Sequence, residues 1–120
     1  MGDRISVQFG TEEKFNCGAT YVEKGVVLFH HWGGARFGDE ALAYASELLE
    51  SRKGTRKPLD RFEPNTVMVD FLRHILKDYP VVEDNLYLEK DVNAGDNSDN
   101  GNRLIVFNLN TRTVKMIKEE

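Results

Sequence analysis

Two imidazoles, an indole and two glycines follow one another at residues 30–34, His-His-Trp-Gly-Gly. They come directly after the apolar run at residues 26–29 and before a segment with helical apolar spacing. Imidazole titrates near neutrality and can serve as an acid, a base or a metal ligand, while glycine lets another group approach the backbone closely. Any chemistry in this chain is therefore expected first at this stretch.

The two histidines are expected to point in opposite directions. In a strand ending at His31, alternation places His30 and His31 on opposite faces, so they cannot share one metal ion unless the strand breaks at the glycines. His31 stays a candidate general base or ligand, against the alternative of a histidine packed at a sheet edge with its nitrogens bonded to the backbone. Trp32 is typical of a core or interface anchor. Gly33 and Gly34 fit the geometry of a corner, since no phosphate-loop pattern surrounds them.

A second candidate is the oxygen-rich loop at residues 91–102. From Asp96 onward it copies the first half of an EF-hand, but Phe107 stands where the bidentate glutamate belongs and no helices are expected beside it. We therefore reject an EF-hand and assign no metal ligands. Two interpretations stay open: an oxygen-ligand cation site, or a long connection rich in turn formers with a tight bend at Asn100 and Gly101.

Two further features receive structural interpretations. Cys17 is the only cysteine, which excludes an intrachain disulfide and favours a reducing cytoplasm, and we expect an unreactive thiol. Cations gather in and after the first expected helix, where they offset the helix dipole and keep a linker soluble in preference to binding phosphate. They are Arg52, Lys53, Arg56, Lys57 and Arg61.

Apolar periodicity predicts the order strand, strand, helix, helix, strand, strand, strand. Alternating or continuous apolar runs indicate the strands. They are expected at residues 4–9, 26–31, 85–91 and 103–109 and around 114–116, with residues 19–22 left open between strand and loop and residues 23–25 as a turn.

The two helices have recognisable start and stop signals. Asp39 is expected to cap the first helix, which runs to about Lys53 before Gly54. A proline at position 64 suits the first turn of the second helix, and Pro80 ends it. His74 lies off the apolar stripe of this second helix and is expected on the solvated surface.

Strands grouped at both ends of the chain with a helical pair between them are typical of an α+β fold. We predict two layers, a mainly antiparallel sheet with both helices on one face. The 120 residues, 40% of them hydrophobic, suit a single domain over residues 1–120. The apolar runs are too short for a membrane span, and a net charge of −4 argues against nucleic acid as a partner. Open sheet edges predict a homo-oligomer, most simply a dimer.

Three short motifs stand in order along the chain: Met-Gly-Asp-Arg at residues 1–4, His-Trp-Gly-Gly at 31–34, and Asp-Asn at 96–97 ahead of an apolar strand. Together they resemble a group of small prokaryotic and phage-encoded proteins with no assigned activity. The chain differs from the group's pattern at His30, over residues 11–24 and in a longer loop after the Asp-Asn pair. The resemblance implies a shared fold and no particular cofactor. It nominates five residues to test together: Asp3, Arg4, His31, Trp32 and Asp96.

Two functional hypotheses follow. The leading one is a binding or interaction domain of unknown ligand with its pocket at the His31 corner, where the expected ligand contacts are Arg4, Trp32, Gly33 and Gly34. The alternative is a small hydrolase-type enzyme in which His31 acts as acid and base and Asp3 or Asp96 orients it. The enzyme needs a carboxylate within about 3 Å of an exposed imidazole. The binding domain predicts a packed His31 and an exposed apolar patch elsewhere.

Overall fold

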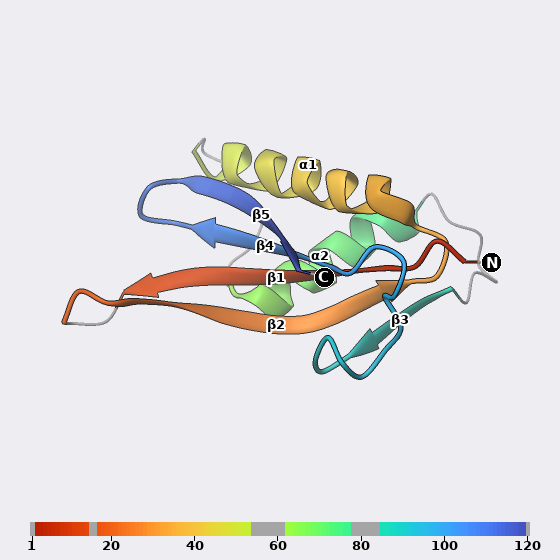
Figure 1. Ribbon diagram of the computed structural model, residues 1–120. Coiled ribbons are helices and arrows are strands. Elements are labelled where there is room, and N and C mark those ends of the chain that lie inside the picture. The colour runs from red at the N-terminus through yellow and green to blue at the C-terminus, as the bar shows by residue number, and fades with distance from the viewer. Residues whose placement is uncertain (1, 15–16, 54–61, 78–84, 120) are drawn as a thin grey trace.

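The computed structural model of the chain describes residues 2–14, 17–53, 62–77 and 85–119, with the backbone alone described for residues 51–53. It combines one five-stranded sheet with two helices (Figure 1). The helices are α1 (Gly34–Lys53) and α2 (Pro64–Leu76). The strands are β1 (Ile5–Lys14), β2 (Thr20–His30), β3 (Leu86–Glu89), β4 (Asn102–Asn108) and β5 (Thr113–Glu119). The predicted α+β class and element order are confirmed.

The first strand lies at the centre of the sheet. The strand order is β3-β2-β1-β4-β5, in which β1 and β4 are parallel and every other neighbouring pair is antiparallel. β3 and β4 therefore run in the same direction on either side of the β1–β2 hairpin. The chain between them, residues 90–101, has to pass across both strands of that hairpin. We call residues 90–101 the crossing loop.

Both helices cover one face of the sheet, and the hydrophobic core lies between the two layers. α1 packs over β1, β4 and β5, and α2 packs over β1 and β2. Alternate residues of β1, namely Ile5, Val7 and Phe9, point into this core and are fully buried. The Phe9 ring contacts the rings of Phe71 at 5.4 Å and Phe107 at 6.1 Å. Burial of each such side chain stabilises the fold by about 1.5–3 kcal/mol.

The opposite face of the sheet carries polar side chains that are also buried. Ser6 is 0% exposed and Asn102 is 1% exposed, although α1 and α2 both pack against the other face of the sheet. The strand register aligns one residue of each strand in a row across the whole sheet: Tyr87, Phe29, Ser6, Asn102 and Glu119. The crossing loop lies over Phe29 and Ser6 of this row, and both residues contact it.

The β1–β2 hairpin is longer than the sequence predicted. β1 continues past Gly10 to Lys14 because a register shift between Gln8 and Gly10 lets the ladder resume. β2 is continuous from Thr20, so the predicted turn at residues 23–25 is wrong, and it lies within a strand. A Cβ at Gly10 would lie 2.8 Å from Val22 Cγ1, which explains a glycine inside the strand. The far end of the hairpin projects beyond the other strands (Figure 1).

The helix boundaries also differ from the prediction. α1 begins at Gly34, more than a turn before Asp39, because the Gly34 N–H donates to the Asp3 carbonyl at 2.9 Å and so satisfies the helix start. His74 is half-buried beside Tyr44, with ring centroids 5.4 Å apart, and not on the open surface. The expected stop signals Gly54 and Pro80 and the linker cations Arg56, Lys57 and Arg61 lie outside the described residues.

Candidate functional site

The corner that follows β2 separates the two histidines. His30, the last residue of β2, is buried on the helix side with its ring 4.7 Å from that of Phe37. Its Nδ1 accepts the Trp32 N–H at 3.2 Å, which ties the corner to the strand. The half-buried His31 ring packs edge-on against the Trp32 indole at 4.7 Å, and Trp32 is 53% exposed. An indole and one imidazole are thus presented together at the surface.

The N-terminal segment lies along this corner. The Asp3 N–H donates to the His31 carbonyl, and the Asp3 carbonyl accepts the Gly34 N–H, both at 2.9 Å. Gly34 has a φ of +67°, and a Cβ there would lie 2.5 Å from Asp3 Oδ2, so both conformation and space require glycine. Gly2 lies against the imidazole, since a Cβ at Gly2 would be 2.7 Å from His31 Nε2. Residues 2–4 therefore form one wall of the corner.

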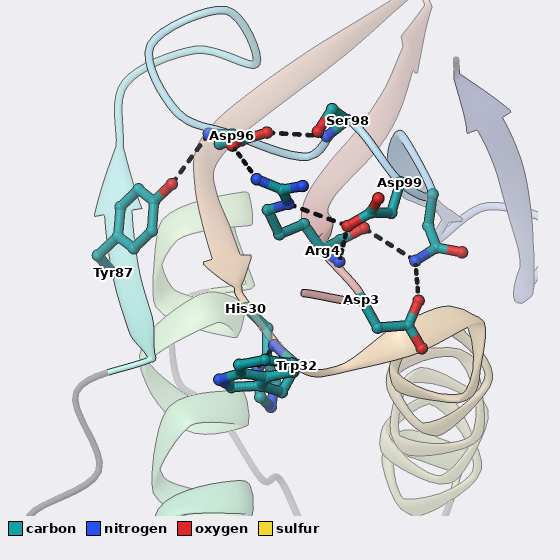
Figure 2. A network of polar contacts seen from close by, with 9 residues as sticks. Asp3, Arg4, His30, Trp32, Tyr87, Asp96, Ser98 and Asp99 are labelled. Atoms are coloured by element: carbon teal, nitrogen blue, oxygen red, sulfur yellow. Dashed lines mark hydrogen bonds and ion pairs between the residues drawn. The ribbon is translucent and has the colours of Figure 1, made fainter. Parts of the chain in front are cut away.

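Arg4 joins this segment to the crossing loop through two carboxylates, which we call the ionic clip (Arg4, Asp96 and Asp99). Its Nη1 donates to Asp96 Oδ2 at 2.7 Å, and its Nε and backbone N–H donate to Asp99 Oδ2 at 2.9 and 2.8 Å (Figure 2). Hydrogen bonds from Arg4 lower the pKa of Asp99, and hydrogen bonds from Ser98 lower the pKa of Asp96. Such solvent-exposed ion pairs add little stability, so the clip sets geometry more than energy.

Asn100 makes a second connection between the loop and the N-terminal segment. Its Nδ2 donates to Asp3 Oδ1 at 2.8 Å and to the Arg4 carbonyl at 2.9 Å, and its backbone N–H donates to the same carbonyl at 2.9 Å. The carbonyl of Asn100 accepts Arg103 Nη1 at 2.5 Å. Both donors of the amide side chain are therefore engaged, and both face oxygen acceptors.

An aromatic contact holds the other half of the loop. The Phe29 ring stacks on Tyr87 with centroids 5.0 Å apart and planes at 7°. The loop backbone at Gly95 covers the same ring, because a Cβ there would lie 2.7 Å from two atoms of Phe29. The Tyr87 hydroxyl accepts the Asp96 N–H at 2.9 Å (Figure 2). Gly95 and Tyr87 thus position the loop at the point where the ionic clip begins.

A chain of buried polar side chains continues from the loop into the sheet. Asn97 Nδ2 donates to Ser6 Oγ, and Ser6 Oγ donates to Asn102 Oδ1, both at 2.8 Å. Asn102 Nδ2 donates to Gln8 Oε1 at 3.2 Å and to Glu119 Oε1 at 2.7 Å. Among the described residues no buried side-chain nitrogen or oxygen lacks a hydrogen-bond partner. The polar face is therefore fully satisfied, which is the condition for such a network to stabilise a fold.

The structure brings the nominated residues to one end of the sheet but engages their carboxylates elsewhere. Asp3, Arg4, Trp32 and Asp96 lie around the start of β1 and the end of β2 (Figure 2). Asp3 Oδ1 accepts from Asn100, and Asp96 Oδ2 accepts from Arg4. Within the described part of the chain, no carboxylate is hydrogen-bonded to the His31 imidazole.

The crossing loop also encloses a polar hollow of about 220 Å³, lined by Asn97, Ser98, Asp99, Asn100 and Gly101. No group of three or more His, Cys, Asp or Glu side chains in the described ranges is arranged to hold a metal ion. Where a cation was one interpretation of this loop, the structure places the Arg4 guanidinium between Asp96 and Asp99. The guanidinium therefore neutralises the two carboxylates that a bound cation would need as ligands.

Sequence reasoning placed Asp99 only in an oxygen-rich loop and Asn100 only at a tight bend, and it gave Tyr87 no role. No local pattern identifies their partners, because Asp3 and Arg4 precede β1 and Phe29 lies on β2, far away in the sequence. Their roles depend on β1 and β4 being parallel neighbours, which places Ser6 opposite Asn102. The one usable signal was the density of Asp and Asn in the loop, which indicated side-chain hydrogen bonding without naming the partner.

Comparison with known proteins adds no family to this geometry. None of the helices in the described part of the chain is long and apolar enough to cross a bilayer. No protein-family model matches the chain, and neither the curated proteins nor the solved structures contain a match.

Proposed function

We propose that this chain is a small binding domain whose ligand contacts the corner at His31–Gly34. The observation that carries the proposal is the exposed Trp32 indole, 53% accessible and packed edge-on against a half-buried imidazole. Large aromatic side chains left at a surface are typical of binding sites, because they offer contact area at little cost in conformational entropy. The ligand that we propose is a small molecule of unknown identity, with no cofactor assigned.

The surroundings of the indole support this proposal because they are fixed before any ligand arrives. Asp3 is bonded to the corner through two backbone hydrogen bonds, and Arg4 is held by two carboxylates. Gly33 lies against both His30 and Phe37, so the corner has little freedom to move. A preorganised site loses less entropy on binding. Of the predicted contacts, the exposed Trp32 is the one that we propose faces the ligand, with Arg4 and Gly34 as supports.

The alternative, a hydrolase-type enzyme, requires a carboxylate that orients His31. Asp3 and Asp96, the two candidates, are bonded to Asn100 and Arg4. Without a base–orienter hydrogen bond the imidazole has no fixed tautomer for acid–base work. We therefore favour binding over hydrolysis.

Trp32 is the only tryptophan, so its intrinsic fluorescence tests the proposal directly. We expect ligands from a library of small metabolites to change its emission, and His31→Ala to weaken their binding by about tenfold, the loss of one modest contact. His74→Ala, on α2, is the matched control and should bind as the wild type does. An unchanged affinity in His31→Ala would contradict the proposed binding site. Turnover of a bound ester or phosphate would favour the hydrolase alternative.

We further propose that two copies pair through the β3 edge. The β5 edge carries Lys115 and Lys118, charges that discourage strand pairing. β3 presents Leu88, which is 47% exposed, beside Leu76 of α2, which is 48% exposed. These side chains border an apolar groove of about 290 Å³, lined by Leu28, Leu72, Leu76, Leu86, Tyr87 and Leu88. A second β3 would cover this groove and pair with the edge of β3 that faces away from β2.

Light scattering across a concentration series tests the pairing. Leu88→Glu should lower the dimer fraction, because it places two carboxylates in the interface, whereas Ile117→Glu on the opposite edge should not. A wild type that stays monomeric at the highest attainable concentration would contradict the proposal.

Cellular location and ancestry belong to the same set of proposals. A single cysteine suits a reducing cytoplasm. The motifs at residues 1–4, 31–34 and 96–97 support a relationship to the small prokaryotic and phage-encoded group. The net charge of −4 disfavours nucleic acid as the partner.

A further inference from the structure

The crossing loop contains the one asparagine–glycine pair of the chain, Asn100 and Gly101. Asparagine is among the chemically labile residues. The peptide nitrogen that follows it can attack the side-chain amide carbon, and a glycine in that next position offers the least steric hindrance. In an unstructured chain, this pair is therefore the place where an asparagine is lost first.

The folded loop holds both reacting groups away from that reaction. The attacking atom, Gly101 N, donates its hydrogen to the Asn97 carbonyl at 2.7 Å. The amide that would leave, Asn100 Nδ2, donates to Asp3 Oδ1 and to the Arg4 carbonyl at 2.8 and 2.9 Å. Gly101 itself is fixed at a φ of +73°. Attack thus requires at least three hydrogen bonds to break, which means that the loop has to open.

We propose that Asn100 is a latent site of spontaneous deamidation, closed in the folded loop and exposed whenever the loop opens, and that its modification keeps the loop from closing again. This inference does not depend on the ligand proposed above. It concerns the same loop, however, so a modified molecule would lose one support of the Asp3–Arg4 segment.

The chemistry needs only water as a co-reactant. Gly101 N gives up its proton and forms a bond to Asn100 Cγ, the Cγ–Nδ2 bond breaks, and Nδ2 leaves as ammonia. Water then opens the cyclic imide at either of its carbonyl carbons. The products are an aspartate or an isoaspartate at position 100, each with one new carboxylate and with no change in oxidation state.

The new carboxylate would stand where the structure requires a donor. Nδ2 of Asn100 faces two oxygen acceptors, Asp3 Oδ1 and the Arg4 carbonyl. An ionised oxygen in its place would face a carboxylate and a carbonyl at hydrogen-bond distance with no proton between them, which is repulsive. Deamidation therefore removes the two hydrogen bonds that Asn100 Nδ2 donates in the closed loop. The modified loop is then expected to stay open.

The test measures deamidation at Asn100 by peptide-resolved mass spectrometry at mildly alkaline pH. We expect Asn100 in the folded wild type to deamidate at least about tenfold more slowly than in the same chain in denaturant. This ratio corresponds to a loop that is open for less than about a tenth of the time. Arg4→Ala, which cuts the ionic clip, should raise the folded-state rate several-fold. Arg36→Ala, on the exposed start of α1, is the matched control and should leave the rate unchanged.

Two further measurements keep the inference falsifiable. If Arg4→Ala fails to fold, Asp96→Ala removes only one of the two ion pairs and replaces it in the comparison. Asn100→Asp mimics one product and should speed amide hydrogen exchange throughout residues 96–101. Equal rates in the folded and denatured wild type would overturn the protection, and unchanged exchange in Asn100→Asp would overturn the loss of closure.

Discussion

Both faces of the sheet are buried at its central strands, β1 and β4, but by different means. The helix-side face buries aliphatic and aromatic side chains against α1 and α2, with Phe9 and Phe71 at its centre. The opposite face buries hydrogen-bonded polar groups around Ser6 and Asn102 and is closed by a loop and not by a helix. Apolar burial is non-directional, whereas a polar network fixes the positions of its members. The first face therefore holds the fold together, and the second positions the candidate site.

The largest effect should come from the helix-side face. Phe71 is fully buried and contacts the rings of Phe9, Phe37 and Tyr44. Phe71→Ala should lower the free energy of unfolding by about 3–5 kcal/mol, through lost transfer energy and the cavity that remains. Denaturant unfolding measures this change. Val69→Ala, at an exposed position of the same helix, should stay within about 0.5 kcal/mol.

An intermediate effect is expected from the polar face. Asn102→Ala leaves Ser6 without its acceptor and Gln8 and Glu119 without a donor. The cost should be about 1–3 kcal/mol, since buried polar groups would lose their partners. Unfolding curves of this variant are to be compared with those of Asn110→Ala in an exposed turn. If Asn102→Ala lowered the free energy of unfolding as much as Phe71→Ala does, the proposed difference in stability between the two faces would be wrong.

A smaller and local effect is expected at the ionic clip. Arg4→Ala should leave the global unfolding midpoint nearly unchanged, because its two ion pairs are exposed to solvent. Amide hydrogen exchange should nevertheless accelerate across residues 96–101 while the helix-side core stays protected. Uniform exchange across the chain in this variant would mean that the clip stabilises the whole fold.

The smallest effect is the pH dependence of the same clip. The pKa of Asp96 and the pKa of Asp99 are both lowered in the folded state, by hydrogen bonds from Ser98 and from Arg4 respectively. A lowered folded pKa contributes stability above the unfolded value of about 3.9, and that contribution is lost as the pH falls through the folded value. Loop exchange should therefore rise only on acidification below about pH 3.9. Replacing both carboxylates by alanine should remove this rise.

Sequence patterns predicted most of the helices and strands but not which strands lie next to one another in the sheet. Alternation at residues 5–9 and the apolar run at 104–107 identified two central strands, and the same alternation separated His30 from His31. Nothing local indicates that these two strands pair in parallel, because the pairing joins residues far apart in the sequence, such as Ser6 and Asn102. The start of α1 was missed because its first N–H is satisfied by Asp3, a residue of the segment before β1 that is far away in the sequence.

The same distinction between local pattern and long-range pairing applies to the residues of the candidate site. Trp32 and His31 were nominated because residue type alone marks them. The partners of Asp99, Asn100 and Tyr87 were not predicted, because each partner belongs to another segment of the chain. The predicted roles of Asp3 and Asp96 rested on proximity to His31, whereas the structure gives both carboxylates a better partner in the loop and the N-terminal segment.

The central position of β1 has a consequence for how the chain is made. Ser6 and Asn102 hydrogen-bond across 96 positions of sequence, so β1 is synthesised long before β4, the strand that covers its second edge. Such long-range pairing slows folding, and the waiting hairpin exposes an unpaired edge to other chains in the meantime. A nascent chain stalled before β4 should therefore be aggregation-prone, however well its two helices have formed.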